Sequence, residues 1–309
     1  MVEAAERIAG QVLRTPLIET MIRGHRLWLK CECLQTGGAF KLRGATNRLL
    51  LLSPEERTWG VVAFSSGNHA QGVAIAAKRL GIAATIVMPA DAPRIKIDAT
   101  RAQGAKIIFF DRVRDSREAI AAAIASDSGA TVVPSFDDPH IVAGQGSVGI
   151  EIAEQLAELG LAPRRLVVPT GGGGLASGIA LACPEAEIVC VEPEGWDDMA
   201  RSLAAGEILP VGDNPPPTLC DALQTPRVSP ITFAILQERG ALALAVSETE
   251  VREAMRFAWR QHGLIVEPGG AVALAALLAG KVEPIEGTVA VVSGGNVDPE
   301  LHARIVEGA

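Results

Sequence analysis

Apolar and polar positions divide the chain into two kinds of segment that alternate. Short runs of apolar, often β-branched residues have the length of buried strands, and the alanine-rich segments between them have the length of helices. Strands are expected at residues 61–64, 84–89, 106–110 and 131–134, with helices at 69–81, 92–104 and 114–129. Gly81, Gly104 and Gly129 close these helices, in keeping with the preference for glycine just after a helix. The alternation predicts a parallel sheet covered by helices.

The same alternation starts again near residue 146. Helices are expected at 146–160, 175–183, 247–263 and 270–279, and strands at 165–169, 187–193, 241–246 and from 288 onward. Residues 210–230 are rich in proline and follow neither period, so they are expected to form a loop or an interdomain segment. Two such series in 309 residues predict two α/β lobes.

Composition excludes several classes of protein. The net charge is −8 and no run of five basic residues occurs, so binding to nucleic acid or to an anionic membrane surface is not expected. No apolar stretch approaches membrane-spanning length, and the N-terminal segment lacks the apolar core of a secretion signal, so a cytoplasmic location is expected. The five cysteines lack C-x-x-C spacing, which favours buried thiols over a zinc or redox site.

The segment VVPTGGGGLASGIA, residues 167–180, places four consecutive glycines between an expected strand and an expected helix. Unpaired N–H groups and the helix dipole favour an anion at such a point, and glycine lets the anion approach the backbone. The turn therefore predicts a phosphate site. A dinucleotide is one candidate, because Gly171, Gly173 and Ala176 fit G-x-G-x-x-A and Glu192 ends the next strand.

Three further segments carry polar residues in small, apolar surroundings. Lys41 in GGAFKLRGA is either an exposed charge at a helix start or a partly buried amine, whose lowered pKa would suit Schiff-base chemistry. The turn FSSGNHAQG, residues 64–72, can clamp a carboxylate with backbone N–H groups, while Asn68 offers an amide to a phenolic oxygen. Ser293 in VVSGGNVD either directs a hydroxyl at a ligand or starts a turn.

Together, AFKLRGA, SSGNHAQGVA, GGGGLASGIA and SGGNVD resemble the fold type II pyridoxal-phosphate enzymes, and within them the serine/threonine dehydratase and serine racemase branch. The resemblance covers nearly the whole chain and favours pyridoxal phosphate over the dinucleotide. It implies a two-lobed α/β fold of the tryptophan synthase beta-like type, with open parallel sheets and flanking helices. The large cofactor-binding domain would comprise residues 1–53 and 138–309, and the small domain residues 54–137.

The resemblance also implies roles for single residues. Lys41 would hold pyridoxal 5'-phosphate through a Schiff base and remove the Cα proton of the substrate, and Ser66 would act on the opposite face of the ring. The implied cofactor-binding residues are Phe40, Lys41, Asn68, Gly171, Gly172, Gly173, Gly174, Leu175 and Ser293. The implied substrate-binding residues are Ser65, Ser66, Asn68 and His69.

The segment VEPEGWDD resembles the divalent-cation site of the metal-activated members of this family. Glu192 and Asp198 would supply carboxylates and Trp196 its main-chain carbonyl, a set of oxygen ligands that suits magnesium, calcium or manganese. The alternative is two acids stabilised near a helix start. One departure from the family precedes Phe40, where residues 37–39 are Gly-Gly-Ala instead of the common Thr-Gly-Ser.

The expected activity is that of a pyridoxal-phosphate-dependent dehydratase, an ammonia-lyase. It would convert L-threonine or L-serine to 2-oxobutanoate or pyruvate and ammonia by α,β-elimination. Within the family, the alternatives are a serine racemase or a dehydratase of 3-hydroxyaspartate or phenylserine. Outside it, they are an NAD-binding oxidoreductase and a non-catalytic ligand-binding protein. The resemblance also implies a homodimer.

Overall fold

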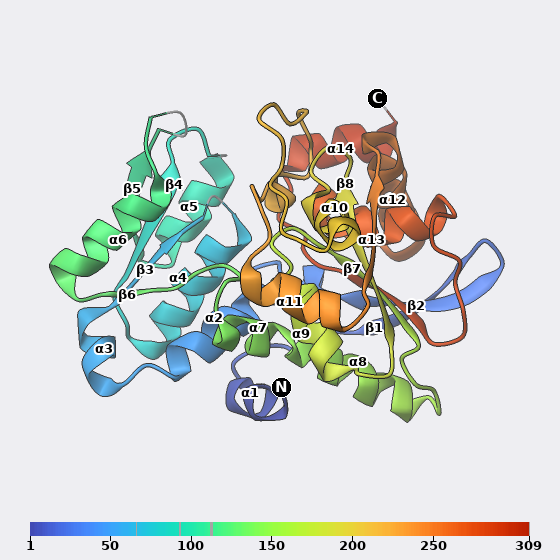
Figure 1. Cartoon of the computed structure of the whole chain (residues 1–309), viewed down its shortest axis with the longest axis horizontal. Coiled ribbons are helices and arrows are strands. Elements are labelled where there is room, and N and C mark those ends of the chain that lie inside the picture. The colour runs from blue at the N-terminus through green and yellow to red at the C-terminus, as the bar shows by residue number, and fades with distance from the viewer. Residues whose placement is uncertain (66, 93, 112–113, 309) are drawn as a thin grey trace.

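The computed structural model describes residues 1–65, 67–92, 94–111 and 114–308 and divides them between two lobes, each built on its own β-sheet. Figure 1 shows the lobes side by side, with β3 to β6 in one and β1, β2 and β7 to β10 in the other. None of the helices in this part of the chain combines the length and the apolar character that a membrane span requires.

The smaller sheet has four parallel strands in the order β5-β4-β3-β6. Side chains alternate across it, so Val61 packs beneath α4 in one apolar cluster while Val62 joins Ala121 of α6 in another on the opposite face. The elements of this lobe are α3 (Pro54–Trp59), β3 (Val61–Phe64), α4 (Asn68–Leu80), β4 (Ala84–Pro89), α5 (Arg94–Ala102), β5 (Lys106–Phe110), α6 (Arg117–Ser128) and β6 (Thr131–Val132).

The larger sheet has six strands in the order β1-β2-β10-β7-β8-β9. Its strands are β1 (Leu17–Ile22), β2 (His25–Cys31), β7 (Arg165–Pro169), β8 (Glu187–Pro193), β9 (Leu242–Val246) and β10 (Thr288–Val292). β1 pairs with β2 in antiparallel fashion, whereas the other pairs are parallel, so the expected parallel sheet carries one antiparallel strand at its edge. Arg23 and Gly24 make the connecting turn with φ of 49° and 82°, as a two-residue hairpin requires.

Helices cover both faces of the larger sheet. One face packs against α12 and α13 and the other against α8 and α9, with two separate apolar clusters between the layers. The helices of this lobe are α1 (Val2–Ile8), α7 (Pro139–Gln145), α8 (Ser147–Glu158), α9 (Gly174–Ala182), α10 (Asp198–Ala205), α11 (Pro230–Glu238), α12 (Glu248–His262), α13 (Pro268–Leu278) and α14 (Pro299–Glu307), with short 3₁₀ turns η1 (Glu32–Leu34) and η2 (Asp221–Leu223).

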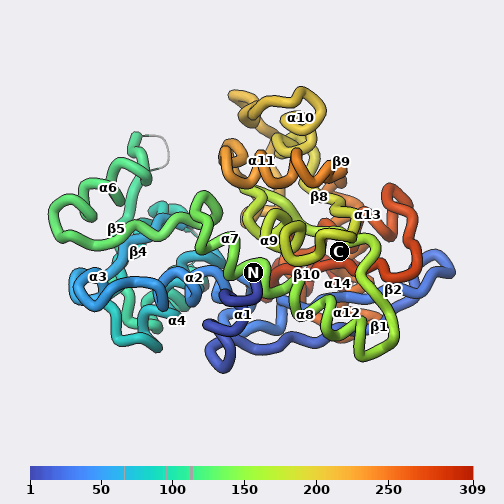
Figure 2. Tube along the Cα trace, turned by 60° about the horizontal axis from the view of Figure 1, so that its bottom comes forward, coloured from blue at the N-terminus to red at the C-terminus, as the bar shows by residue number. Residues whose placement is uncertain are grey.

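Helix α2 (Lys41–Leu50) belongs to both lobes. Its apolar side chains Leu42, Ala45 and Leu49 lie in the core of the small lobe. Gly72 of α4 allows close contact there, since a Cβ at position 72 would lie 3.0 Å from the carbonyl carbon of Lys41. Figure 2 shows α2 beside α4 and α7, which are the helices it contacts most. The first residue of α2 is thereby held at the junction of the two lobes.

Candidate active site

A cavity of about 460 Å³ lies at the carboxyl ends of parallel strands from both sheets. Ser65 follows β3, the glycine turn follows β7 and Ser293 follows β10, so three sequence-distant loops meet there. Eleven of the residues singled out from the sequence line this cavity: Phe40, Lys41, Ser65, Asn68, His69, Gly171, Gly172, Gly173, Gly174, Leu175 and Ser293. Ser66, the expected residue on the second ring face, lies outside the described residues.

Lys41 is the first residue of α2, and its side chain enters the cavity. Its Nζ donates to the carbonyl oxygen of Ser135 at 2.9 Å and lies 5.1 Å from the centre of the Phe40 ring. Burial lowers the pKa of the Lys41 amine to about 8, because the charged form loses solvation there. Of the two alternatives that the sequence leaves open for Lys41, the partly buried amine is the one found.

The glycine turn forms the other end of the cavity. Helix α9 begins at Gly174, and Gly173 precedes it with φ of 85° and no side-chain cap. A Cβ at Gly172 would lie 2.4 Å from the ring of Phe136, and one at Gly174 would lie 3.0 Å from the Cβ of the same residue. The turn thus presents main chain alone at an uncapped helix start, which suits a phosphate. A cofactor with an anionic tail and an aldehyde fits a cavity that holds both this turn and a lysine amine.

The turn before α4 lines another side of the cavity. The Ser65 Oγ accepts a hydrogen bond from the backbone N–H of Gly67 at 3.2 Å. His69 donates from Nε2 to the carbonyl oxygen of Val133 at 2.9 Å. Burial, assisted by the nearby charge of Lys41, lowers the pKa of His69 to about 3, so its imidazole is neutral. A neutral, hydrogen-bonded His69 suits a structural or binding position and not that of a proton donor.

Sequence reasoning missed Glu267, which also lines the cavity. Its Oε1 accepts a hydrogen bond from the Asn68 Nδ2 at 2.5 Å, while Asn68 Oδ1 accepts from the Asn296 Nδ2 at 2.8 Å. The Asn68 amide is therefore held from two sides. A sequence signal does exist, because Glu267 is the one acidic residue in the otherwise apolar stretch LIVEPGGAVALAALL.

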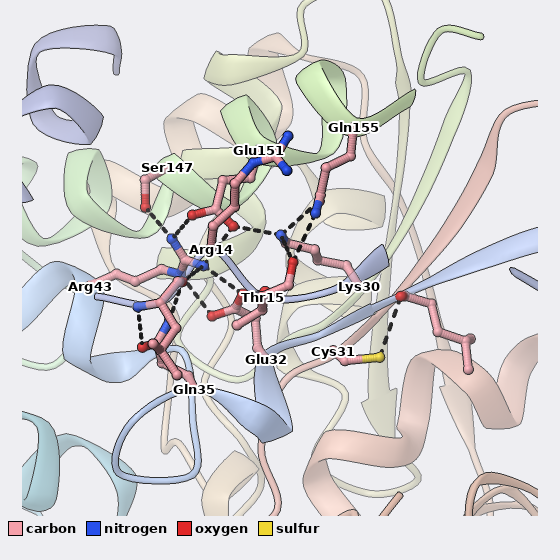
Figure 3. A network of polar contacts seen from close by, with 12 residues as sticks. Arg14, Thr15, Lys30, Cys31, Glu32, Gln35, Arg43, Ser147, Glu151 and Gln155 are labelled. Atoms are coloured by element: carbon pink, nitrogen blue, oxygen red, sulfur yellow. Dashed lines mark hydrogen bonds and ion pairs between the residues drawn. The ribbon is translucent and has the colours of Figure 1, made fainter. Parts of the chain in front are cut away.

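A second residue missed from the sequence, Arg43, joins α2 to the large lobe. Figure 3 shows its guanidinium between Glu32 and Glu151, with Nε 2.8 Å from Glu32 Oε2 and Nη1 2.6 Å from Glu151 Oε1. Lys30 joins the same network through Glu151. Arg43 and Glu32 are fully buried, so this network fixes α2 two residues beyond Lys41.

A further arginine, Arg117 of α6, lies on the cavity wall. Its guanidinium carbon is 5.5 Å from the centre of the Phe64 ring, and its Nε donates to Glu118 Oε1 at 2.9 Å. The side chain is one-third exposed, which leaves donors free to face a ligand.

Two of the expected cation ligands, Glu192 and Asp198, lie near each other and are not part of the lining of this cavity. Glu192 accepts from the backbone N–H groups of Met199 at 3.0 Å and Ala200 at 2.9 Å. Asp198 is fully buried and its carboxylate has no side-chain hydrogen-bond partner in the described part of the chain; the backbone N–H groups of Asp198 and Val228 act on it. Burial raises the pKa of Asp198 to about 7 and that of Glu192 well above its ordinary range. Two carboxylates buried together fit a cation, which would compensate their charge.

No three histidine, cysteine, aspartate or glutamate side chains gather into a metal-binding group within the described ranges. The ligand set expected from the sequence contains only two such side chains, so its third ligand has to be a backbone oxygen. The assignment of Glu192, Trp196 and Asp198 stays a prediction.

Comparisons with known proteins agree with this geometry. A profile of the family described as "Pyridoxal-phosphate dependent enzyme" matches residues 8–294. The chain is 42% identical to an L-threo-3-hydroxyaspartate ammonia-lyase of Pseudomonas sp., over 100% of this chain and 98% of the relative. It is 40% identical to an L-threonine ammonia-lyase of Thermotoga maritima, over 98% of this chain and 76% of the relative. Its fold matches the structure of maize serine racemase with a TM-score of 0.91 and 36% identity, covering 99% and 95% of the two chains.

Proposed function

The chain belongs to the family of pyridoxal-phosphate dependent enzymes, and from this premise we propose that it is an ammonia-lyase acting on a β-hydroxy-α-amino acid. L-Threonine and L-serine are the substrates proposed first, with 2-oxobutanoate or pyruvate and ammonia as products. The observation that carries the proposal is the amine of Lys41 in one cavity with the uncapped glycine turn. An NAD-binding oxidoreductase has no use for such an amine, so we set that alternative aside.

Pyridoxal phosphate, when bound, supplies a ring that withdraws electrons from the Cα atom of an amino acid. Gly171 to Gly174 and Leu175 would hold its phosphate, Phe40 would pack beside its ring, and Ser293 would face its pyridine nitrogen. Asn68 retains one Nδ2 hydrogen beyond the bond to Glu267, and this hydrogen is free for a phenolic oxygen.

The chain's own residues supply substrate binding and proton transfer. Ser65, which follows β3, and Asn68 and His69, the first residues of α4, would bind the substrate carboxylate, mainly through their backbone. Neutral Lys41 Nζ would remove the proton from Cα, since burial makes the free amine accessible near neutral pH. Loss of the β-hydroxyl with a proton as water leaves an enamine, which hydrolyses to the 2-oxo acid and ammonia.

Replacement of Lys41 tests this function. Lys41→Ala is expected to abolish both the visible absorbance of the bound cofactor and the release of 2-oxo acid. Lys106→Ala, at an exposed lysine on β5, is the matched control and is expected to retain both. A yellow, active Lys41→Ala protein would refute the proposal.

A second candidate substrate is 3-hydroxyaspartate, and the position of Arg117 favours it. A guanidinium on the cavity wall can pair with a β-carboxylate that threonine and serine lack. The names of relatives in Pseudomonas sp. and yeast agree with this candidate. If Arg117 pairs with this β-carboxylate, Arg117→Gln lowers kcat/KM for 3-hydroxyaspartate far more than for threonine. Equal losses for both substrates would exclude this role of Arg117.

Racemisation through Ser66 stays a prediction. Incubation of the enzyme with L-serine, followed by chiral analysis of the remaining amino acid, distinguishes a racemase from a dehydratase. Ser66→Ala is expected to abolish any formation of D-serine. Loss of D-serine formation with elimination retained would assign Ser66 to the second face of the ring.

A divalent cation at Glu192 and Asp198 is likewise proposed, supported by the complete burial of two neighbouring carboxylates. A homodimer and a cytoplasmic location also stay predictions. Light scattering on the purified protein measures the first, and cell fractionation the second.

A further inference from the structure

Glu267 is a buried carboxyl group beside the cavity with no part in the reaction as described above. Only 1% of its surface is exposed, and it directly precedes Pro268, the first residue of α13. Its Oε1 accepts from Asn68, and its Oε2 has no hydrogen-bond partner in the part of the chain that the structure describes. A carboxyl group is rarely buried in this way without a function, since the ionised form loses its solvation.

Glu267 ends a chain of hydrogen bonds that joins the loops of the site. The Nδ2 of Asn296 donates both to the carbonyl oxygen of Gly37 at 2.8 Å and to the Oδ1 of Asn68. Both hydrogens of that Nδ2 are then used, which fixes Asn68 Oδ1 as an acceptor and directs Asn68 Nδ2 toward Glu267. The loop before Lys41, the start of α4, the loop after β10 and the start of α13 are thus linked.

Two glycines make room for this chain. A Cβ at Gly294 would lie 1.9 Å from Glu267 Oε1, and a Cβ at Gly38 would lie 2.3 Å from Asn296 Oδ1. Neither position admits a side chain while the hydrogen bonds persist. Gly38 takes φ of 73°, a backbone conformation that favours glycine, so both the backbone and the contact with Asn296 require glycine at this position.

The surroundings of Glu267 bring its pKa close to neutral pH, so both its ionised and its neutral form are populated there. Burial raises the pKa of Glu267 to about 7. The positive charge of Lys96 from α5 lowers this pKa, and the negative charge of Asp221 from η2 raises it. Lys96 Nζ also pairs with Asp221, so much of its charge is compensated. Asn68 of α4 is the remaining polar neighbour that acts on this carboxyl.

We propose that Glu267 is a positioning residue: it orients the Asn68 amide toward a bound cofactor, and its own proton sets the charge beside that amide. This rests on the proposed use of pyridoxal phosphate. With Glu267 ionised, the negative charge favours a positive charge on the lysine-linked cofactor; with Glu267 protonated, that effect is lost. The absorbance of the bound cofactor therefore changes with pH through Glu267.

The test compares two variants. Glu267→Gln keeps an acceptor oxygen for Asn68 but does not titrate, and Glu267→Ala has neither the acceptor oxygen nor a titratable group. In the wild-type holoenzyme the cofactor absorbance is expected to show a step near pH 7, and in Glu267→Gln this step is expected to be absent. Glu267→Ala is expected to bind the cofactor about tenfold more weakly than Glu267→Gln, as the loss of one oriented hydrogen bond predicts.

Two further variants sharpen the test. Asp221→Asn removes a charge that raises the pKa of Glu267 and releases Lys96, so the step is expected to move to lower pH. Asp137→Asn removes an exposed carboxylate from the rim of the same cavity, and the step is expected to stay in place. A step that persists unchanged in Glu267→Gln overturns the proposal.

Unfolding of the cofactor-free protein separates this proposal from the proposed function. A carboxyl whose pKa is raised on folding makes the folded state less stable as pH rises from about 4.3 to 7. The melting temperature of wild type is thus expected to fall relative to Glu267→Gln across that range. If the melting temperatures of wild type and Glu267→Gln change equally with pH, the assignment of Glu267 is wrong, whether or not the cofactor binds. If Lys41→Ala keeps the cofactor absorbance, only the proposed function is wrong.

Discussion

The lowered pKa of Lys41 predicts how the cofactor-free enzyme captures pyridoxal phosphate as pH is varied. Only the neutral amine attacks an aldehyde, so the rate constant for capture follows the neutral fraction. With a pKa of about 8, roughly 9% of the amine is neutral at pH 7 and roughly 91% at pH 9. An ordinary lysine with a pKa of about 10.4 has roughly 0.04% neutral at pH 7, about 200-fold less.

These fractions give two different pH profiles. For the buried amine, the rate constant is expected to rise about tenfold from pH 7 to pH 9 and then to level off. For an ordinary lysine it would rise about 100-fold over the same interval and continue upward beyond pH 10. A midpoint near pH 8 with a plateau above about pH 9 is thus the signature of desolvation at Lys41.

Stopped-flow absorbance of the cofactor mixed with the cofactor-free protein measures the rate constant. Capture by a free lysine derivative in the same buffers corrects for the ionisation of the cofactor itself. Lys41→Ala provides the blank. A profile that keeps rising tenfold per pH unit up to pH 10 would show that the amine is solvated, and the account of the site given above would be wrong.

Three other predictions concern the cofactor site, the buried network and the cation. Gly172→Ala is expected to weaken cofactor binding at least tenfold in an absorbance titration, because its Cβ displaces the Phe136 ring; an unchanged affinity would contradict this. Arg43→Ala is expected to lower the free energy of unfolding in urea by about 3–5 kcal/mol, since it leaves buried carboxylates unpaired, whereas Arg14→Ala at an exposed ion pair should cost less than about 1 kcal/mol. A chelator is expected to lower the melting temperature of the wild type but not of Asp198→Asn, and equal shifts in both proteins would argue against a cation at this residue.

Much of the fold follows from the period of the apolar residues alone. The strands expected at 61–64, 84–89, 106–110 and 165–169 coincide with β3, β4, β5 and β7. Buried parallel strands are continuous apolar runs, which makes their limits sharp in a sequence. Gly81, Gly104 and Gly129 take φ of 66°, 85° and 76° after their helices, as expected of helix ends.

Other elements carry a weaker local signal. In β1, polar residues such as Glu19 and Thr20 interrupt the apolar positions, and its place at the edge depends on pairing with β2. The strand expected at 131–134 is shorter, because β6 ends at Val132. Short helices such as α7, which begins at Pro139, are fixed by contacts with α2 that the local sequence does not encode.

In the candidate site, too, some features follow from local sequence motifs and others depend on contacts between distant parts of the chain. Motifs with a local chemical meaning identified the glycine turn and Lys41, and the structure brings them into one cavity. Arg43 pairs with Glu151, 108 residues away in the sequence, and Asn68 with Glu267, 199 residues away. Nothing in a single sequence indicates which of these residues will be paired. Contacts of this kind depend on the tertiary fold and are visible only in three dimensions.

Helix α2 is attached to the small lobe by its apolar side chains and to the large lobe by Arg43. If the lobes rotate relative to one another, a segment bound to both must lie near the axis, where displacement is smallest. Atoms farther from α2 would be displaced more. Under such a rotation the entrance would open for substrate and product, while the nitrogen of Lys41, on the first residue of α2, would be displaced little.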